Sequence, residues 1–326
     1  MKKHIAIIVA FVMLMSSMIS IYAVAEQKKL SVVTTIFPVY DWAREIVGEG
    51  SDVEITMLLD SGVDLHSFQP TAQDIMKIAT CDAFIYVGGE SDEWVEDALR
   101  EAINANMKVV NLLEALGDDA KVEEIVEGME AEEEEHEGDE EAEEEIEYDE
   151  HVWLSLRNAK KLTAVIAEAL AEADPEQADS FTANCEAYAA RLDALDQAYA
   201  AVVNGAAVDT VLFGDRFPFR YLTDDYGLRY YAAFVGCSAE SEASFETIAF
   251  LSGKVDELGL PTVLTIEGDN HRIAETIVGN TQTKNAAILA MDSMQATTGE
   301  DVKSGVTYLG VMEANLEVLK QALTKE

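Results

Sequence analysis

The chain is poor in cysteine and in basic residues. It has three cysteines among 326 residues, Cys81, Cys185 and Cys237, and their odd number and wide spacing argue against a disulfide framework and a paired-cysteine zinc knuckle. One disulfide with a free thiol, and three buried thiols, both stay open. Lysine and arginine number 22 against 63 aspartate and glutamate residues, giving a formal net charge of −41. Such an acidic surface argues against nucleic acid and anionic membranes as partners and favours cations.

Several catalytic signatures are also absent. The sequence contains no P-loop for nucleotide phosphates, no GxSxG nucleophile turn and no HExxH zinc-protease motif. Nucleotide hydrolysis, serine hydrolysis and zincin-type proteolysis are therefore disfavoured.

The N-terminus has the pattern of a secretory signal peptide. Lys2 and Lys3 precede an apolar run from Ile5 to Ile21, and Ala23-Val24-Ala25 forms a small-residue cleavage site. Residues 1–25 are predicted to be removed, although an uncleaved membrane anchor is the alternative. No cysteine at this site supports a lipid anchor, and no later run is long and apolar enough to cross a membrane. The sequence predicts an exported protein, periplasmic or at the cell surface.

The remaining chain alternates apolar strands with helices in two separate stretches, which is typical of parallel α/β sheets. Between them lie some forty-five helical residues, including a predicted helix from Ala178 to Val203 that would be roughly 38 Å long. This helix could link two lobes; the alternative is that it packs on a single domain. We predict an α/β fold of two parallel-sheet lobes joined by a long rigid linking helix, with the N-terminal lobe at 26–156, the helical linker at 157–205 and the C-terminal lobe at 206–326. The predicted strands are 30–36, 53–59, 82–87 and 108–111 in the first lobe, and 210–213, 228–233, 262–266 and 286–291 in the second.

An acidic loop at 122–150 interrupts the first lobe. It contains 18 aspartate or glutamate residues and no lysine or arginine. Because its like charges repel and it can bury little apolar area, we expect a mobile loop over Glu123–Glu147. It could collect cations at low affinity, as salt-sensitive electrostatic attraction allows, or it could be a solvated tether without a metal role.

Potential metal ligands gather where predicted strands end. His66 follows the strand 53–59, and Asp215, Glu267 and Asp292 follow three strands of the second lobe, while His151 ends the acidic loop. Ligands of open parallel sheets bind beyond the carboxyl ends of the strands, so these side chains are expected to converge. Imidazoles with one or two carboxylates suit Zn²⁺ or Mn²⁺. Taken singly, each histidine could instead be a hydrogen-bonded surface residue and each acid a helix cap.

The residues also resemble a known family along the whole mature chain. The stretches that carry the resemblance are VVTTIFPVYDWAREIVG, MLLDSGVDLHSFQPTAQDI, CDAFIYVGG, HVWLSLRNA and the late MDSM. They are similar to the zinc- and manganese-binding solute-binding proteins of bacterial ABC importers. The resemblance implies two α/β lobes bridged by a rigid helix, with one metal ion between the lobes.

The same resemblance implies a ligand set. His66 matches the first histidine ligand, His151 the second, and Asp292 the fourth ligand of manganese-type members. The third ligand falls within LFGDRFPFRYL, where Asp215 is the nearest candidate, although an alignment without a gap places Arg216 at that position. Glu267 resembles a nearby outer carboxylate and is held in reserve.

The function that follows is capture of a divalent metal, Zn²⁺ or Mn²⁺, as a transported ligand. The protein would act as a monomer, without catalysis, and would deliver the ion to an ABC permease. Two histidines with two carboxylates make a harder site than three histidines, which could relax a zinc preference toward manganese. The alternatives are a surface adhesin with a structural metal and a secreted metallohydrolase, which would need an open coordination position and a poised base.

Overall fold

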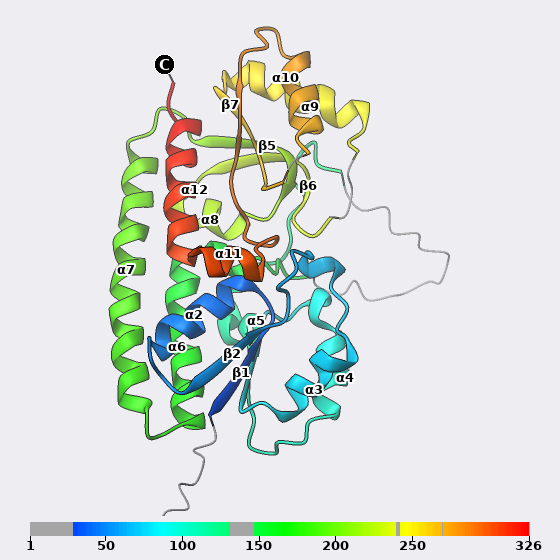
Figure 1. Ribbon diagram of the computed structural model, residues 1–326. Coiled ribbons are helices and arrows are strands. Elements are labelled where there is room, and N and C mark those ends of the chain that lie inside the picture. The colour runs from blue at the N-terminus through cyan, green and yellow to red at the C-terminus, as the bar shows by residue number, and fades with distance from the viewer. Residues whose placement is uncertain (1–28, 131–146, 239–241, 269, 326) are drawn as a thin grey trace, which may run out of the picture.

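The computed structural model describes residues 29–130, 147–238, 242–268 and 270–325. The predicted signal peptide, residues 1–25, lies outside the described residues. Two lobes are stacked end to end, and a pair of long helices runs along one side of them (Figure 1). Each lobe is built on a four-stranded parallel sheet, which confirms the predicted two-lobe α/β fold.

The N-terminal lobe contains the sheet β2-β1-β3-β4. Its central strand β1 is buried because its β-branched apolar residues Val32 and Val33 pack between the helices that connect the strands. The strands are β1 (Leu30–Thr34), β2 (Val53–Met57), β3 (Ala83–Tyr86) and β4 (Lys108–Asn111), and the helices are α2 (Phe37–Val47), α3 (Ala72–Thr80), α4 (Trp94–Arg100) and α5 (Leu112–Leu116).

The C-terminal lobe repeats this arrangement with the sheet β6-β5-β7-β8. Its strands are β5 (Thr210–Phe217), β6 (Arg229–Val235), β7 (Thr262–Thr265) and β8 (Ala287–Ala290), and its helices are α8 (Arg220–Tyr226), α9 (Phe245–Leu258), α10 (Arg272–Asn280), α11 (Gly299–Ser304) and α12 (Tyr308–Ala322).

Strand β5 is longer than predicted. It was expected to end at Phe213, but it continues to Phe217 after a shift in its register with β6. Gly214 makes this possible, because a Cβ there would lie only 2.6 Å from the Cα of Ala274 in α10. Asp215 therefore lies within a strand, and not in a loop after it.

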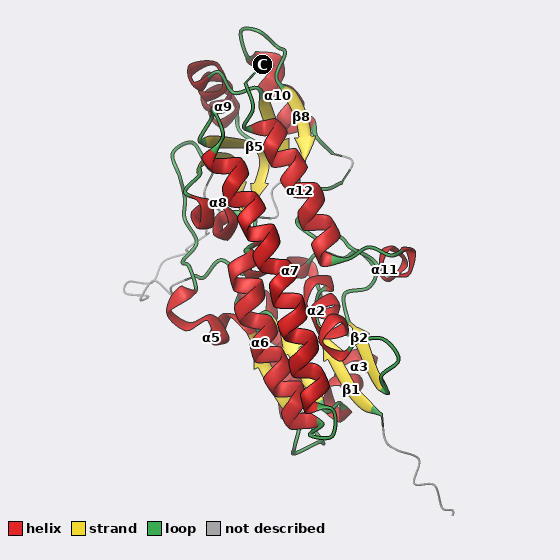
Figure 2. Cartoon of the chain, turned by 90° about the vertical axis from the view of Figure 1, so that its left-hand side faces the viewer, coloured by secondary structure: helices red, strands yellow, loops and turns green. Residues whose placement is uncertain are grey.

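Two helices separate the two sets of strands along the sequence: α6 (Leu156–Ala173) and α7 (Ala178–Asn204). They pack side by side (Figure 2). The 27 residues of α7 span about 40 Å. This helix contacts α2 in the first lobe and α8 and α12 in the second. Near its C-terminal end the Tyr199 hydroxyl donates to the carbonyl of Met312 at 2.7 Å. Helix α7 therefore joins the two lobes.

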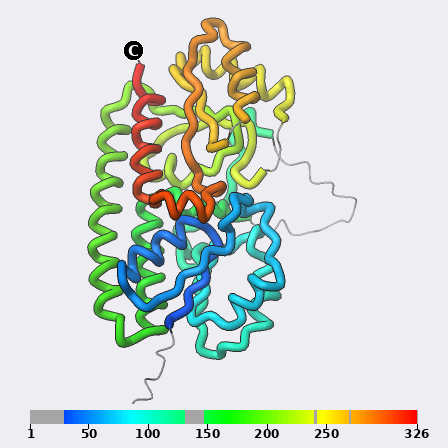
Figure 3. Tube along the Cα trace, viewed as in Figure 1, coloured from blue at the N-terminus to red at the C-terminus, as the bar shows by residue number. Residues whose placement is uncertain are grey.

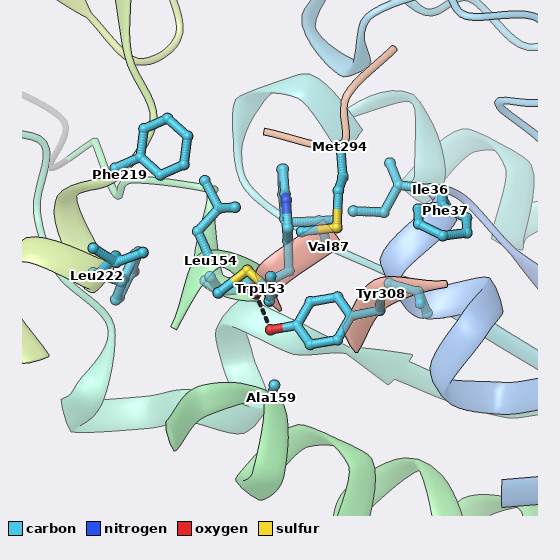
Figure 4. Packing of buried hydrophobic residues seen from close by; sticks show 14 of the residues in the cluster. Ile36, Phe37, Val87, Trp153, Leu154, Ala159, Phe219, Leu222, Met294 and Tyr308 are labelled. Atoms are coloured by element: carbon cyan, nitrogen blue, oxygen red, sulfur yellow. Dashed lines mark hydrogen bonds between the residues drawn. The ribbon is translucent and has the colours of Figure 1, made fainter. Parts of the chain in front are cut away.

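The lobes also share buried contacts around Trp153 and Tyr308. The Tyr308 hydroxyl donates to the carbonyl of Trp153 at 2.7 Å (Figure 4), and its backbone N–H donates to Asp41 Oδ2 at 2.8 Å. The Trp153 indole N–H donates to the carbonyl of Ser293 at 2.8 Å. Tyr308 also packs edge-on against Trp42, with ring centroids 5.2 Å apart. Residues from both lobes thus form one continuous core.

The beginning of the acidic loop is bonded to the C-terminal lobe. Figure 3 shows this part of the chain rising beside the second lobe before the grey trace begins. Glu130 forms a parallel bridge with Phe234 of β6, and its N–H donates to the carbonyl of Ala233 at 3.0 Å. The expectation of a mobile loop thus needs correction at Glu123 and at Glu130, because Glu123 N–H donates to the carbonyl of Glu147 and Glu130 pairs with the edge strand β6. Residues 131–146 lie outside the described residues.

Within the described ranges, no helix has both the length and the apolar character that crossing a membrane requires.

Candidate metal centre

His66 lies in a single 3-10 turn (Leu65–Ser67) after β2. Asp64 begins this turn, and its Oδ1 accepts from the backbone N–H of His66 at 3.1 Å. The imidazole Nδ1 lies 2.7 Å from Ser91 Oγ and 3.5 Å from Glu150 Oε2. Leu65 anchors the turn in the core, since its side chain is 1% exposed. These contacts hold both the position and the orientation of the His66 ring.

His151 is fully buried at the point where the chain returns from the acidic loop. Asp149 Oδ1 accepts from the backbone N–H of His151 at 2.9 Å and from its Nδ1 at 3.0 Å. Because an ionised carboxylate can only accept, this contact places the proton of the neutral imidazole on Nδ1. The Nε2 atom then carries a lone pair, the arrangement that an outer carboxylate gives a metal-binding histidine.

The two imidazoles face each other. His66 Nε2 and His151 Nε2 are 3.3 Å apart. The carboxylate of Glu150 beside His66 Nδ1 favours a proton there, so that Nδ1 donates to Ser91 Oγ and Nε2 again carries a lone pair. Burial and the nearby His151 lower the pKa of His66 to about 3, which disfavours an imidazolium at this position. Two lone pairs directed at one point are the arrangement that a bound cation would stabilise.

Cys237 completes this cluster. Its Sγ and one nitrogen of each of the two histidines lie within 4.8 Å of one another. Gly236 brings the chain against the ring of His151, where a Cβ would lie 2.8 Å from Cε1. Burial, with the charges of Glu150 and then Glu123, raises the pKa of the Cys237 thiol well above its usual value.

Sequence reasoning missed Cys237. The rule that ligands gather beyond strand ends could have found it, because Cys237 lies two residues after the end of β6. Sequence reasoning also missed Asp149 and Glu150, which were counted as part of the acidic loop but are each only 2% exposed.

The predicted carboxylate ligands lie in a separate arrangement in the C-terminal lobe. Asp215 accepts from the N–H groups of Arg216 at 2.9 Å and Ile266 at 3.4 Å, and Asp292 accepts from the N–H of Met294 at 2.7 Å. Burial, and then the charge of Glu267, raise the pKa of Asp292 to about 6. In the described part of the chain, neither Asp215 nor Asp292 forms a group with both histidines within 4.8 Å.

Glu267, the reserve candidate, is occupied by the loop after β8. Its carboxylate accepts from the N–H and the hydroxyl of Ser293, both at 2.7 Å, and from the N–H of Gln295 at 3.1 Å. These contacts give it a clear structural role, because they hold the loop that follows Asp292.

Arg216, at the position that the gap-free alignment gives to the third ligand, forms an ion pair with Asp64. A guanidinium has five N–H donors and no lone pair for a metal. The pair instead ties β5 of the second lobe to the turn that carries His66.

The chain matches a family of known proteins over most of its length. The model of the family described as zinc-uptake complex component A, periplasmic, matches residues 32–322. The zinc-binding lipoprotein AdcA of Streptococcus pneumoniae is 32% identical over 320 residues, which cover 96% of this chain and 61% of that lipoprotein. The high-affinity zinc uptake system protein ZnuA of Bacillus subtilis is 30% identical over 297 residues, which cover 90% of this chain and 88% of that protein.

Solved structures agree with this assignment. The Zn(II)-bound ZnuA-like domain of Streptococcus pneumoniae AdcA has a TM-score of 0.70 and 27% identity, with 91% of this chain and 100% of that domain covered. The metal-dependent lipoprotein YcdH of Bacillus subtilis has a TM-score of 0.72 and 25% identity, with the same coverage. Because the present chain spans 61% of the full AdcA lipoprotein, it corresponds to part of that relative. The predicted family resemblance is confirmed: the chain belongs to the zinc-uptake complex component A family.

Proposed function

We propose that this protein captures Zn²⁺ outside the cytoplasm and delivers it to an ABC permease. The observation that carries the proposal is the 3.3 Å separation of His66 Nε2 and His151 Nε2. Two nitrogens bound to a tetrahedral Zn²⁺ at about 2.0–2.1 Å lie about 3.3 Å apart. The ion therefore fits between the rings without moving either, and it would be cargo, not a resident cofactor.

The surroundings support a cation at this point. Asp64 Oδ1 lies 4.0 Å from His66 Nε2, Asp149 Oδ1 accepts from His151 Nδ1 at 3.0 Å, and Glu150 Oε2 lies 3.5 Å from His66 Nδ1. Outer carboxylates of this kind orient histidine ligands and increase their basicity. The relatives support zinc as the ion, since they are named zinc-binding and zinc-uptake proteins.

The remaining parts of the proposal are a monomer located in the periplasm or at the cell surface, with no catalytic activity. A non-catalytic role fits the paired histidines, of which His151 is buried and is oriented by Asp149. Mn²⁺ is the alternative cargo. Asp215 and Asp292 stay predicted ligands, and each is tested by the titration below.

The test is native mass spectrometry and competition titration of the chain without residues 1–25, stripped of metal and then given Zn²⁺ or Mn²⁺. We expect one tightly bound Zn²⁺, lost in His66→Ala and retained in the matched variant His271→Ala, whose Nδ1 has no hydrogen-bond partner in the described part of the chain. Asp215→Asn and Asp292→Asn report whether either carboxylate contributes. Zinc binding that is indifferent to His66 would refute the proposal.

Delivery is tested in cells. In a strain that lacks this protein, growth under zinc limitation should be restored by the natural chain and by His271→Ala, and not by His66→Ala. Equal growth with all three chains would show that zinc delivery does not depend on His66.

A further inference from the structure

We propose that the Cys237 thiolate is a protein ligand of the captured metal, completing a site of two imidazoles and one sulfur. The inference rests on the proposed function and deepens it. It starts from the cluster in which Cys237 Sγ and the two histidine nitrogens lie within 4.8 Å of one another.

The distances suit a tetrahedral ion. A sulfur at about 2.3 Å and a nitrogen at about 2.0–2.1 Å from Zn²⁺ lie about 3.6 Å apart. The sulfur thus has to approach the histidine nitrogens by no more than about 1.2 Å, a movement that rotation of a cysteine side chain provides. Both histidines can stay where they are.

A second observation points independently to a cation here. Glu150 is 2% exposed, and its Oε2 has no hydrogen-bond partner among the residues that the structure describes, although it lies 3.5 Å from His66 Nδ1. A buried carboxylate oxygen without a partner is costly unless positive charge is nearby. An ion held by His66, His151 and Cys237 supplies that charge.

Binding to the metal converts the thiol of Cys237 to a thiolate, because thiols bound to divalent ions lose their proton outright. The proton passes to solvent as the sulfur–metal bond forms, and no oxidant or reductant is involved.

Arg216 cannot fill the position that the gap-free alignment gives to the third ligand, because its guanidinium pairs with Asp64 and has no lone pair for a metal. Cys237 can take this position, while Asp215 stays a predicted ligand that the titration above tests.

A sulfur ligand also changes which metal the site prefers. Thiolate is a soft ligand that favours zinc over manganese, whereas carboxylates suit manganese. The sequence-based expectation of a harder site, open to manganese, gives way in this proposal to a site selective for zinc.

The experiment uses Co²⁺ as a spectroscopic probe in the chain without residues 1–25, kept reduced. We expect intense near-ultraviolet sulfur-to-cobalt charge-transfer absorption in the natural chain and in Cys185→Ser, a buried cysteine distant from the site in sequence. Cys237→Ser should lose this band. Its zinc affinity should fall by more than the roughly 10- to 100-fold that loss of an outer partner costs. The ratio of its affinity for zinc to its affinity for manganese should also fall.

Two results would overturn the inference in different ways. Cobalt that binds in a His66-dependent manner without the charge-transfer band would exclude Cys237 as a ligand and leave zinc capture intact. Absence of any His66-dependent binding of Co²⁺ or Zn²⁺ would remove the proposed function and this inference together. Because the band is read in the natural chain, the test does not depend on whether Cys237→Ser folds.

Discussion

Replacing Gly236 by alanine should damage the metal site through a single methyl group. The new Cβ would lie 2.8 Å from Cε1 and 3.0 Å from Nδ1 of His151, and 3.0 Å from the carbonyl oxygen of Phe217. Gly236 does not have a positive φ, so alanine fits the backbone and the effect comes from the contact alone. The Phe217 carbonyl belongs to β5, and the ring of His151 is buried and bonded to Asp149. Neither the Phe217 carbonyl nor the His151 ring can therefore move away from the new methyl group without disturbing these bonds.

The size of the effect follows from these distances. Ordinary contact begins at 3.4 Å, so the ring of His151 has to move by about 0.6 Å. Metal–ligand distances tolerate only about 0.2 Å. We expect zinc affinity to fall by roughly 10- to 100-fold, or about 1.4–2.7 kcal/mol, together with about 1–3 kcal/mol of lost stability from overpacking.

The assay is competition for Zn²⁺ against a chromophoric chelator, with urea unfolding of the metal-free protein. Gly253→Ala in α9 is the matched control, because nothing lies within 4 Å of its new Cβ. That variant should bind zinc normally and gain about 0.5–1 kcal/mol from the better helix former. If Gly236→Ala binds zinc as tightly as Gly253→Ala does, Gly236 does not position His151.

Three further predictions concern other parts of the structure. Asp149→Asn should weaken zinc binding by roughly 10- to 100-fold, because the proton of His151 is no longer held on Nδ1; unchanged affinity in the chelator assay would contradict this. Trp153→Phe should lower the free energy of unfolding in urea by about 1–3 kcal/mol, because the carbonyl of Ser293 loses its buried donor. A loss below about 0.5 kcal/mol would show that this hydrogen bond contributes little. Burial raises the pKa of Asp92 to about 7, against about 3.9 in the unfolded chain. Between these two values the folded protein keeps a proton on Asp92 that the unfolded chain has lost. The free energy of unfolding therefore falls as the pH rises from about 4 to 7. Asp92→Asn should flatten this profile and be the more stable protein at pH 8, which urea unfolding at pH 5.5 and pH 8 measures; parallel profiles for the two proteins would refute the assignment.

The alternating strands and helices could be read from the sequence, because buried parallel strands are short β-branched runs that differ clearly from the helices between them. The length of β5 could not. Gly214-Asp215-Arg216 reads as a turn, and only the close approach of Ala274 explains why glycine continues a strand there. This difference in turn moved Asp215 from a predicted loop into the sheet.

The histidines of the candidate site were identifiable because each stands alone beside a strand or turn. Cys237 was missed because β6 was predicted to end at Ala233, whereas it continues to Val235, two residues before Cys237. Asp149 and Glu150 were hidden for another reason. Composition alone cannot show that the last two acids of a long acidic run are buried beside the histidines.

The first turn of α12 has a consequence for the order in which the protein assembles. Tyr308 packs on Trp42 and binds Asp41, a residue 267 positions earlier in the chain. Since synthesis proceeds from the N-terminus, the first lobe cannot complete its core until the last helix has been made. A partly synthesised chain therefore exposes an aromatic surface that chaperones can bind. The two lobes should consequently unfold together in one cooperative transition, and not as two independent domains.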